Sequence, residues 1–201
     1  MRIVGGVARG RRLAVPRAGT RPTADAVREA VFAALTARWS ALDGLSVLDL
    51  YAGSGAMGLE AVSRGARTLV AVESDRAAAT VIRTNSLAVA PPGADVSIRR
   101  QRVEAVLAGP PPSTFDLVIA DPPYADAVAA FARVLPLLMT GGWLGADAAV
   151  VWEQSSRGDA PDWPDALRPW PVRTYGETAV HVAIFSPDDP TPHEDGTAPA
   201  R

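Results

Sequence analysis

Residues 47–60 read Val47-Leu-Asp-Leu-Tyr-Ala-Gly-Ser-Gly-Ala-Met-Gly-Leu-Glu60, and this stretch decides the fold. Its first four residues are apolar except for Asp49, which predicts a short buried strand. A turn of small residues at 52–56 follows, and after it apolar residues recur at helical spacing. A helix that begins after a glycine turn exposes backbone N–H groups without intrahelical partners, so a ligand can bind there. The stretch therefore predicts a strand, a ligand-binding turn and a helix.

Two ligands and one purely structural role fit this turn. Gly53, Gly55 and Gly58 spell the G-x-G-x-x-G pattern of a dinucleotide site, with the acidic Glu73 about 20 residues further on. However, Asp49 at the strand end would repel a pyrophosphate, and it suits the cationic aminoacyl end of S-adenosylmethionine. We therefore favour S-adenosylmethionine, with a dinucleotide or a turn that only packs as the alternatives.

Strand-like and helical segments alternate along the rest of the chain. We expect strands at 68–72, 96–98, 115–120 and 148–153, and helices at 75–87, 104–107 and 126–138, the last interrupted or kinked by Pro136. Residues 154–170 are expected to form a loop with one helical turn, and 172–175 and 178–185 an antiparallel hairpin. This order predicts an α/β, Rossmann-like fold with a mostly parallel sheet, helices on both faces and the hairpin at one edge.

The chain divides into three parts. Residues 1–20 are expected to be a basic N-terminal extension that forms a small β-hairpin. Residues 21–185 form the α/β domain, which begins with a helix capped by Thr23 and ending near Trp39. In that helix Arg28 lies off the apolar stripe. Residues 186–201 are rich in Pro, Asp, Thr and Gly, which predicts a disordered tail.

Positive charge is concentrated at the N-terminus. Residues 1–40 contain eight arginines against two acids, giving +6, whereas the other 161 residues carry twelve arginines and twenty acids, giving −8. Such clustering is typical of a phosphate-binding patch. We predict that RNA contacts come from Arg2, Arg9, Arg11, Arg12 and Arg21. A solvated N-terminus without a ligand is the alternative.

Several classes of site are disfavoured by composition. The chain has no cysteine and only two histidines, so we expect no disulfide and no metal centre. No segment resembles a signal peptide or reaches membrane-spanning length. We expect a soluble, cytoplasmic protein.

Asp121-Pro-Pro-Tyr124 follows the predicted strand at 115–120 and indicates the type of reaction. The lone pair of an exocyclic amine is delocalised into its base, so the nitrogen is a poor nucleophile. Acceptors on both N–H groups can turn it toward tetrahedral geometry; Asp121 supplies one and the Pro122 carbonyl the other. Tyr124 offers a ring on which a flipped or unpaired base can stack. A capped strand-to-helix turn is the alternative.

Taken together, these motifs resemble one family, the bacterial small-subunit (16S) ribosomal RNA guanine-N2 methyltransferases, or RsmD-like enzymes. The similarity covers nearly all of residues 2–185. The glycine turn and the Asp-Pro-Pro-Tyr motif are shared with many methyltransferases. Narrower matches are Arg2-Ile-Val-Gly-Gly6, Gly10-Arg-Arg-Leu13, Arg21-Pro-Thr23 with Val27-Arg-Glu-Ala-Val-Phe32, and Tyr175-Gly176.

The resemblance implies a seven-stranded methyltransferase fold, S-adenosyl-L-methionine as cofactor and a guanine of 16S ribosomal RNA as acceptor. It places the catalytic role on Asp121, Pro122 and Tyr124, which would orient the guanine amine. Within the cofactor site, Asp49, Gly53 and Gly55 would surround the methionine end, Glu73 would hold the ribose hydroxyls, and the Val103 backbone would meet the adenine. The complete set of expected cofactor contacts is Asp49, Tyr51, Gly53, Ser54, Gly55, Glu73, Val103 and Asp121. One departure is Arg102-Val103-Glu104, where the family often has an acidic or amide residue after the third strand.

Three other functions are to be weighed against this one. A DNA adenine-N6 methyltransferase could use the same tetrapeptide, although 201 residues leave no room for a separate DNA-reading domain of the usual size. A non-catalytic RNA-binding or ribosome-assembly protein could retain the cofactor fold. A dinucleotide oxidoreductase is the weakest candidate, because no proton relay accompanies the glycine turn. We expect ribosomal RNA or the small subunit, or its assembly intermediate, as partner, and a monomer.

Overall fold

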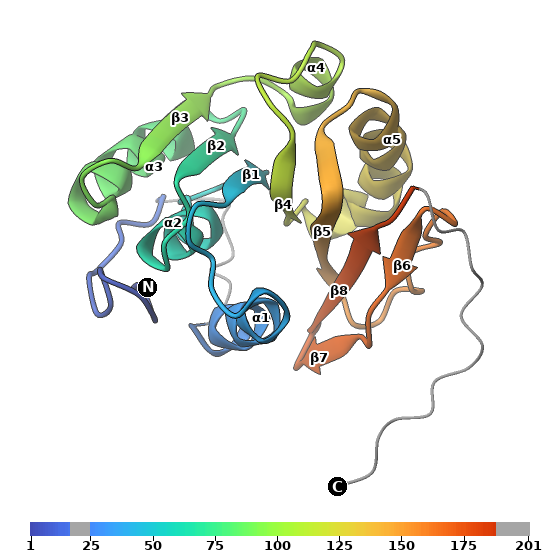
Figure 1. Cartoon of the computed structure of the whole chain (residues 1–201), viewed down its shortest axis with the longest axis horizontal. Coiled ribbons are helices and arrows are strands. Elements are labelled where there is room, and N and C mark those ends of the chain that lie inside the picture. Colours follow the sequence, from blue (N-terminus) through green and yellow to red (C-terminus); the bar gives the residue numbers. More distant parts are fainter. Residues whose placement is uncertain (17–24, 188–201) are drawn as a thin grey trace, which may run out of the picture.

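A mixed sheet of eight strands forms the centre of the molecule in the computed structural model, which describes residues 1–16 and 25–187. The strand order is β3-β2-β1-β4-β5-β8-β6, and the short β7 pairs with β8 beside this path of seven (Figure 1). Strands β1 to β5 are parallel, and β8 runs antiparallel to its neighbours. Their bounds are β1 Ser46–Leu50, β2 Thr68–Val72, β3 Asp95–Arg99, β4 Phe115–Ala120, β5 Leu144–Ser155, β6 Leu167–Pro169, β7 Arg173–Tyr175 and β8 Thr178–Phe185.

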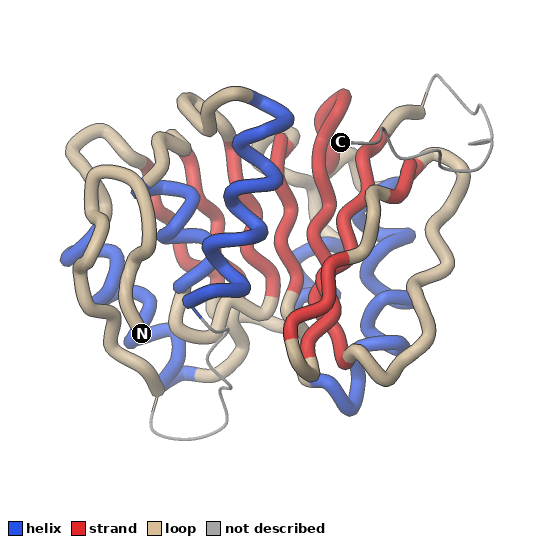
Figure 2. Tube along the Cα trace, turned by 90° about the horizontal axis from the view of Figure 1, so that it is seen from below, coloured by secondary structure: helices blue, strands red, loops and turns tan. Residues whose placement is uncertain are grey.

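Helices cover both faces of the sheet (Figures 1 and 2). One face carries α1 (Asp25–Trp39), α2 (Ala56–Ser63) and α3 (Arg76–Val89). The other carries α4 (Val103–Leu107) and α5 (Ala127–Thr140), which follows a 3₁₀ turn, η1 (Tyr124–Asp126). Successive strand residues alternate between the two cores: Val47 packs with the first set of helices, and Leu48 with the second. The predicted α/β architecture is confirmed.

The structure corrects three boundaries. Strand β5 begins at Leu144 rather than 148, because Leu144 pairs with Phe115 of β4 across an irregularity in register. A short edge strand, β6, occupies part of the predicted loop, where its Leu167 is buried against the sheet. Of the interruption or kink expected at Pro136, the interruption is wrong, since α5 runs unbroken from Ala127 to Thr140, and the kink stays a prediction.

The N-terminal segment, residues 1–16, contains an antiparallel pairing but no extended strands. Arg2 and Arg12 form an isolated bridge, and the Ile3 N–H donates to the Arg11 carbonyl at 2.9 Å. The predicted hairpin is therefore present only as this short pairing. Its backbone N–H groups at Val4, Gly5 and Ala8 donate to side chains of α2 instead of continuing a ladder.

Some expectations lie outside the described residues. These are the RNA contact of Arg21, the Thr23 helix cap and the tail from residue 188 onward. The division into an extension, a domain and a tail stays a prediction. Among the residues that are described, no helix combines the length and apolarity that crossing a membrane requires.

Candidate active site

Three carboxylates converge where β1, β2 and β4 end. Asp49 lies in β1, Glu73 follows β2 directly, and Asp121 follows β4 directly. The three strands are adjacent and parallel, with β1 in the middle. Glu73 and Asp121 both act electrostatically on the Asp49 carboxyl. The topology thus gathers three acidic groups that are far apart in sequence at one edge of the sheet, where open α/β sheets bind ligands.

Asp49 is held in an environment that opposes its negative charge. It is 3 % exposed, and its Oδ2 accepts a hydrogen bond from the Gly58 N–H at 2.9 Å. The pKa of Asp49 is raised to about 7, mainly by burial; the Gly58 hydrogen bond opposes this rise, and the charges of Asp121 and Glu73 add to it. A nearby cation would reverse this effect by favouring the ionised form. The site is therefore electrostatically suited to a positively charged group.

The glycine turn approaches these carboxylates closely. Gly53 and Gly55 adopt left-handed φ values of 56° and 77°, which a glycine allows without steric cost. Gly58, in the first turn of α2, has no room for a β-carbon, which would lie 2.6 Å from Leu69 and 2.8 Å from Asp49 Oδ2. The spacing of the three glycines thus has two separate causes, turn conformation at the first two and close helix–strand packing at the third.

Glu73 fastens the turn to the end of β2. Its carboxylate accepts hydrogen bonds from the Gly53 N–H at 2.9 Å and the Asp75 N–H at 2.7 Å. Asp75 in turn caps α3 through the Ala78 N–H at 2.8 Å. One acidic side chain therefore connects the glycine turn, β2 and the start of the next helix.

The remaining expected cofactor contacts face different surroundings. Tyr51 has a left-handed φ of 59°, and its buried hydroxyl has no hydrogen-bond partner in the part of the chain that the structure describes. Burial, with a contribution from Glu104, raises the pKa of Tyr51 to about 12, so the hydroxyl stays protonated. The Ser54 hydroxyl donates toward the Met1 sulfur at 3.5 Å, and the Val103 side chain is buried in the core. Ser54 and Val103 would therefore meet a cofactor through their backbones, and these contacts stay predictions.

The Asp121-Pro-Pro-Tyr segment forms a tight connection between β4 and η1. The Asp121 N–H donates to the Leu50 carbonyl at 3.5 Å, and the Asp126 N–H closes the turn on the Pro123 carbonyl at 2.8 Å. Pro122 is buried, Pro123 is exposed, and Tyr124 is the first residue of η1. Asp121 and Pro122 therefore lie on a short, hydrogen-bonded connection next to β1, and their acceptor role stays a prediction.

Arg133 ties the end of this segment to α4. It contacts Asp126 Oδ2 at 2.6 Å and Glu104 Oε1 at 3.2 Å. All three side chains are partly exposed, so these two ion pairs add little to stability. Their effect is to orient the end of the segment relative to α4.

The predicted RNA-contacting arginines lie on the N-terminal segment. Arg9, Arg11 and Arg12 are exposed, and within the described part of the chain none of them forms an ion pair. Arg2 is also exposed but contacts Asp25 at 3.4 Å. Phosphates could therefore approach at least the first three without displacing a carboxylate.

Four buried polar residues that dock this segment were missed from the sequence: Arg28, Glu60, Ser63 and Asn85. The Glu60 carboxylate accepts from the Val4 and Gly5 N–H groups at 2.8 and 2.7 Å, and it pairs with Arg28 and Arg64. A β-carbon at Gly6 would overlap the Ser63 carbonyl oxygen, which explains the second glycine of Arg2-Ile-Val-Gly-Gly6. The sequence does contain one signal of this buried network. Glu60 is a carboxylate in a helix, residues 56–63, whose other residues are apolar or small.

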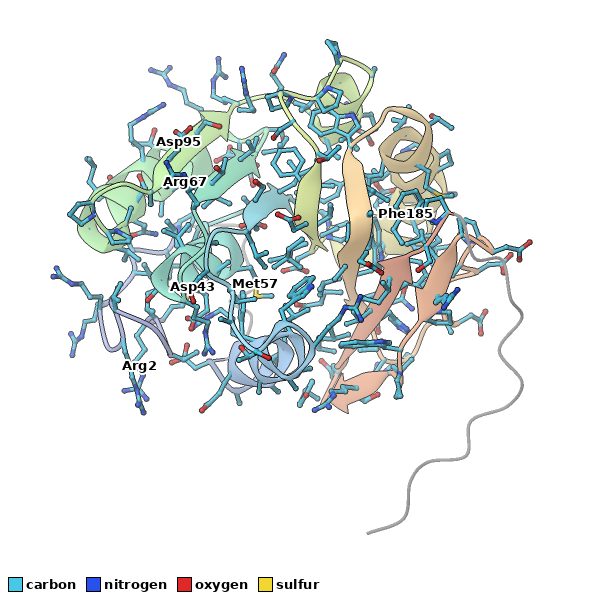
Figure 3. All side chains as sticks on the ribbon, viewed as in Figure 1. Arg2, Asp43, Met57, Arg67, Asp95 and Phe185 are labelled. Atoms are coloured by element: carbon cyan, nitrogen blue, oxygen red, sulfur yellow. The ribbon has the colours of Figure 1, made fainter. Side chains whose placement is uncertain are left out.

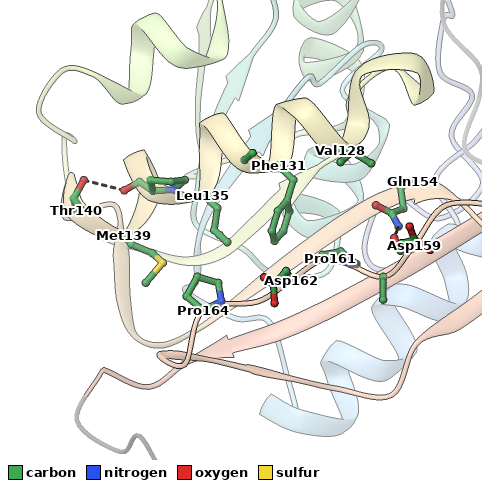
Figure 4. Close-up of a pocket in the computed structure, with 13 residues that line it drawn as sticks. Val128, Phe131, Leu135, Met139, Thr140, Gln154, Asp159, Pro161, Asp162 and Pro164 are labelled. Carbon is green, nitrogen blue, oxygen red and sulfur yellow. Dashed lines mark hydrogen bonds between the residues drawn. The ribbon is translucent and has the colours of Figure 1, made fainter.

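An apolar cavity of about 590 Å³ lies on the face of the sheet that α4 and α5 cover, between α5 and the loop at 159–164 (Figure 4). Phe131, Leu135, Met139 and Pro161 form much of its wall. None of the three converging carboxylates lines it, so it is separate from the candidate active site.

Comparison with known proteins identifies the family. A family model described as "Conserved hypothetical protein 95" matches residues 1–184. The chain belongs to this family. It is 34 % identical over 167 residues to "Ribosomal RNA small subunit methyltransferase D" of Escherichia coli K12, covering 82 % of this chain and 79 % of that protein. The protein of the same name from Haemophilus influenzae is 32 % identical over 155 residues, or 76 % and 78 % of the two chains. The family resemblance inferred from the motifs is confirmed.

Solved structures of methyltransferases share the fold of this chain. The Escherichia coli protein yhhF superposes with a TM-score of 0.80 at 28 % identity, covering 92 % of this chain and 98 % of that one. A magnesium protoporphyrin IX methyltransferase from Synechocystis, solved with bound S-adenosylmethionine, shares the fold alone, at 14 % identity, a TM-score of 0.59 and coverage of 80 % and 79 %. The methyltransferase fold of this chain is thereby established (Figure 3 shows its side chains in place).

Proposed function

We propose that this family member transfers a methyl group from S-adenosylmethionine to the exocyclic N2 amine of a guanine in small-subunit (16S) ribosomal RNA. The observation that carries the proposal is the convergence of Asp49, Glu73 and the Asp121-Pro-Pro-Tyr segment at three adjacent strand ends. The related Escherichia coli and Haemophilus influenzae enzymes are named for ribosomal RNA methylation, which supports the substrate class.

The donor set fits the proposed cofactor. S-adenosylmethionine supplies a methyl group on a sulfonium and also carries a protonated amine. The buried Asp49, with Glu73 and Asp121 nearby, favours such a cationic ligand and disfavours the phosphates of a dinucleotide. Asp49 would bind near the methionine end together with Gly53 and Gly55. Glu73, which already holds the turn, would reach the ribose hydroxyls, and the backbone of Val103 would meet the adenine.

Asp121 and Pro122 would prepare the acceptor. The Asp121 carboxylate and the Pro122 carbonyl accept hydrogen bonds from the two N–H groups of the guanine amine, and Tyr124 stacks on the base. The nitrogen lone pair then points at the methyl carbon. As the new N–C bond would form, the S–C bond would break and release a neutral thioether, and the nitrogen would lose one proton to Asp121 or to water. Positioning supplies most of the rate enhancement, because no strong base is required.

The basic N-terminal segment would guide the RNA. Arg2, Arg9, Arg11, Arg12 and Arg21 are the proposed phosphate contacts, and the acidic remainder of the chain would otherwise repel RNA. We propose a monomer in the cytoplasm that acts on the small ribosomal subunit or on its assembly intermediate.

Nucleoside analysis tests the function. Purified protein and S-adenosylmethionine are incubated with unmethylated 16S RNA, with small subunits and with duplex DNA, and the digested products are separated by mass spectrometry. We expect N2-methylguanosine from a ribosomal substrate and none when Asp121→Ala protein is used. N6-methyladenine in the DNA sample would favour the alternative enzyme, and the absence of any methylated product would favour a non-catalytic assembly protein.

A further inference from the structure

Asn85 of α3 links the basic N-terminal segment to the cofactor turn. Its side chain is 2 % exposed and makes three hydrogen bonds to backbone atoms. Asn85 Oδ1 accepts from the Ala14 N–H at 2.8 Å, while Nδ2 donates to the Ala14 carbonyl at 3.0 Å and to the Ser54 carbonyl at 2.8 Å. Ala14 follows Arg9, Arg11 and Arg12, and Ser54 lies between Gly53 and Gly55.

The chemistry of the amide makes this link specific. A carboxamide combines an acceptor and two donors, and here one N–H donor and two carbonyl acceptors surround it. The reversed orientation would place Nδ2 against the Ala14 N–H, so the neighbours fix the amide in one direction. No other residue type of this size satisfies all three backbone groups. Loss of the amide would leave buried polar groups without partners.

The contacts made by Ser63 and Glu60 hold the segment without a bond to the turn. Ser63 accepts from the Ala8 N–H at 3.0 Å and donates to the Gly5 carbonyl at 2.6 Å. Glu60 binds Val4 and Gly5. The Ser54 hydroxyl of the turn also reaches the segment, but its acceptor is the Met1 sulfur, which forms only weak hydrogen bonds. Among the described residues, Asn85 is therefore the strong polar connection between the two regions.

We propose that Asn85 is a positioning residue that couples RNA binding at the N-terminal segment to S-adenosylmethionine binding at the glycine turn. The proposal rests on the function proposed above. RNA that holds Arg9, Arg11 and Arg12 keeps Ala14 docked, which favours the Asn85 bridge and the present position of Ser54. By thermodynamic linkage, the cofactor must tighten RNA binding by the same factor as RNA tightens cofactor binding.

The test measures cofactor affinity by calorimetry with and without saturating unmethylated 16S RNA. Four proteins are compared: wild type, Asn85→Asp, Asn85→Ala and Ser63→Ala. Asn85→Asp keeps the acceptor for the Ala14 N–H but loses both donated bonds. Ser63→Ala is the matched control, because it removes two docking bonds without touching the turn. Thermal melts establish that each variant is folded at the assay temperature.

We expect RNA to tighten cofactor binding about five-fold or more in the wild type, within the usual range for coupled sites. The factor should fall close to one in both Asn85 variants and persist in Ser63→Ala. Without RNA, both Asn85 variants should also bind the cofactor several-fold more weakly than the wild type. A general loss of stability would not change the ratio of the two affinities in this selective way.

Three results would overturn the proposal: no coupling in the wild type, coupling that survives in folded Asn85 variants, or coupling abolished equally in Ser63→Ala. Failure of the proposed function has a different signature, because then the wild type would show no methylated guanosine.

Discussion

The docking network beneath the N-terminal segment and the carboxylate cluster at the strand ends each contain a buried carboxylate, Glu60 and Asp49, but the charges around it are arranged in opposite ways. In the first, Glu60 lies 3.6 Å from Arg28 and 2.7 Å from Arg64 and also accepts two backbone hydrogen bonds. In the second, Asp49 has two further carboxylates for neighbours, and its pKa rises to about 7. The first network is balanced without a ligand and serves the fold. The second needs a positive charge that a ligand would bring.

The largest effect should come from breaking the balanced network. Glu60→Ala leaves the fully buried Arg28 without its main buried counter-charge and frees two backbone N–H groups. We expect a loss of about 3–5 kcal/mol in the free energy of unfolding, measured by urea denaturation. The double variant Arg28→Met/Glu60→Leu should recover much of this loss, and a single variant as stable as the wild type would show that the network contributes nothing.

A change in the Asp121-Pro-Pro-Tyr segment should lower the rate of methyl transfer rather than the free energy of unfolding. Asp121→Ala removes one of the two proposed acceptors for the guanine amine, so we expect the single-turnover rate to fall about 100-fold or more. Cofactor affinity should stay close to normal, which calorimetry checks. A rate near that of the wild type would limit Asp121 to a structural role at the strand end.

Glu73→Ala should weaken cofactor binding directly and through the turn. The variant loses the proposed ribose contact and the bond to the Gly53 N–H. We expect a cost of about 1.5–3 kcal/mol in binding free energy, read by calorimetry on protein whose circular dichroism is unchanged. Unchanged affinity would remove Glu73 from the cofactor site.

The smallest effect concerns the exposed arginines. Replacing Arg9, Arg11 and Arg12 by Ala should weaken RNA binding and flatten its salt dependence, with the slope falling by about 0.7 for each phosphate that is no longer neutralised. Arg67→Ala is the control, because Arg67 is an exposed arginine just before β2 and is not part of the N-terminal segment. An unaltered salt slope in the triple variant would contradict the electrostatic role of the segment.

The sequence was sufficient for the α/β fold and for the three acidic strand ends, because short apolar strands and glycine turns are local patterns. It was not sufficient for the docking network. Arg28 lies off the apolar stripe of its helix yet is fully buried, since its partners Glu60 and the Arg2 carbonyl come from other segments. Asn85 likewise contacts residues 31 and 71 positions away. Such polar pairs depend on tertiary packing, which no local periodicity reveals.

The raised pKa also sets how stability depends on pH. The pKa of Asp49 is 3.8 in its reference state and about 7 in the folded chain. Between these values the folded state binds the extra proton, so the contribution of Asp49 to stability falls as pH rises from about 4 to 7. Asp49→Asn should remove this dependence.

Proton release on cofactor binding tests the central claim most directly, because it reports whether a cation enters the carboxylate cluster. At pH 6 the Asp49 carboxyl is mostly protonated, and a bound sulfonium and ammonium would drive its ionisation. We predict that calorimetry in buffers of different ionisation enthalpy shows release of close to one proton per S-adenosylmethionine at pH 6. The carboxamide of the Asp49→Asn variant cannot ionise, so that variant corrects for titration of the cofactor itself. Equal proton release by wild type and Asp49→Asn would contradict the account.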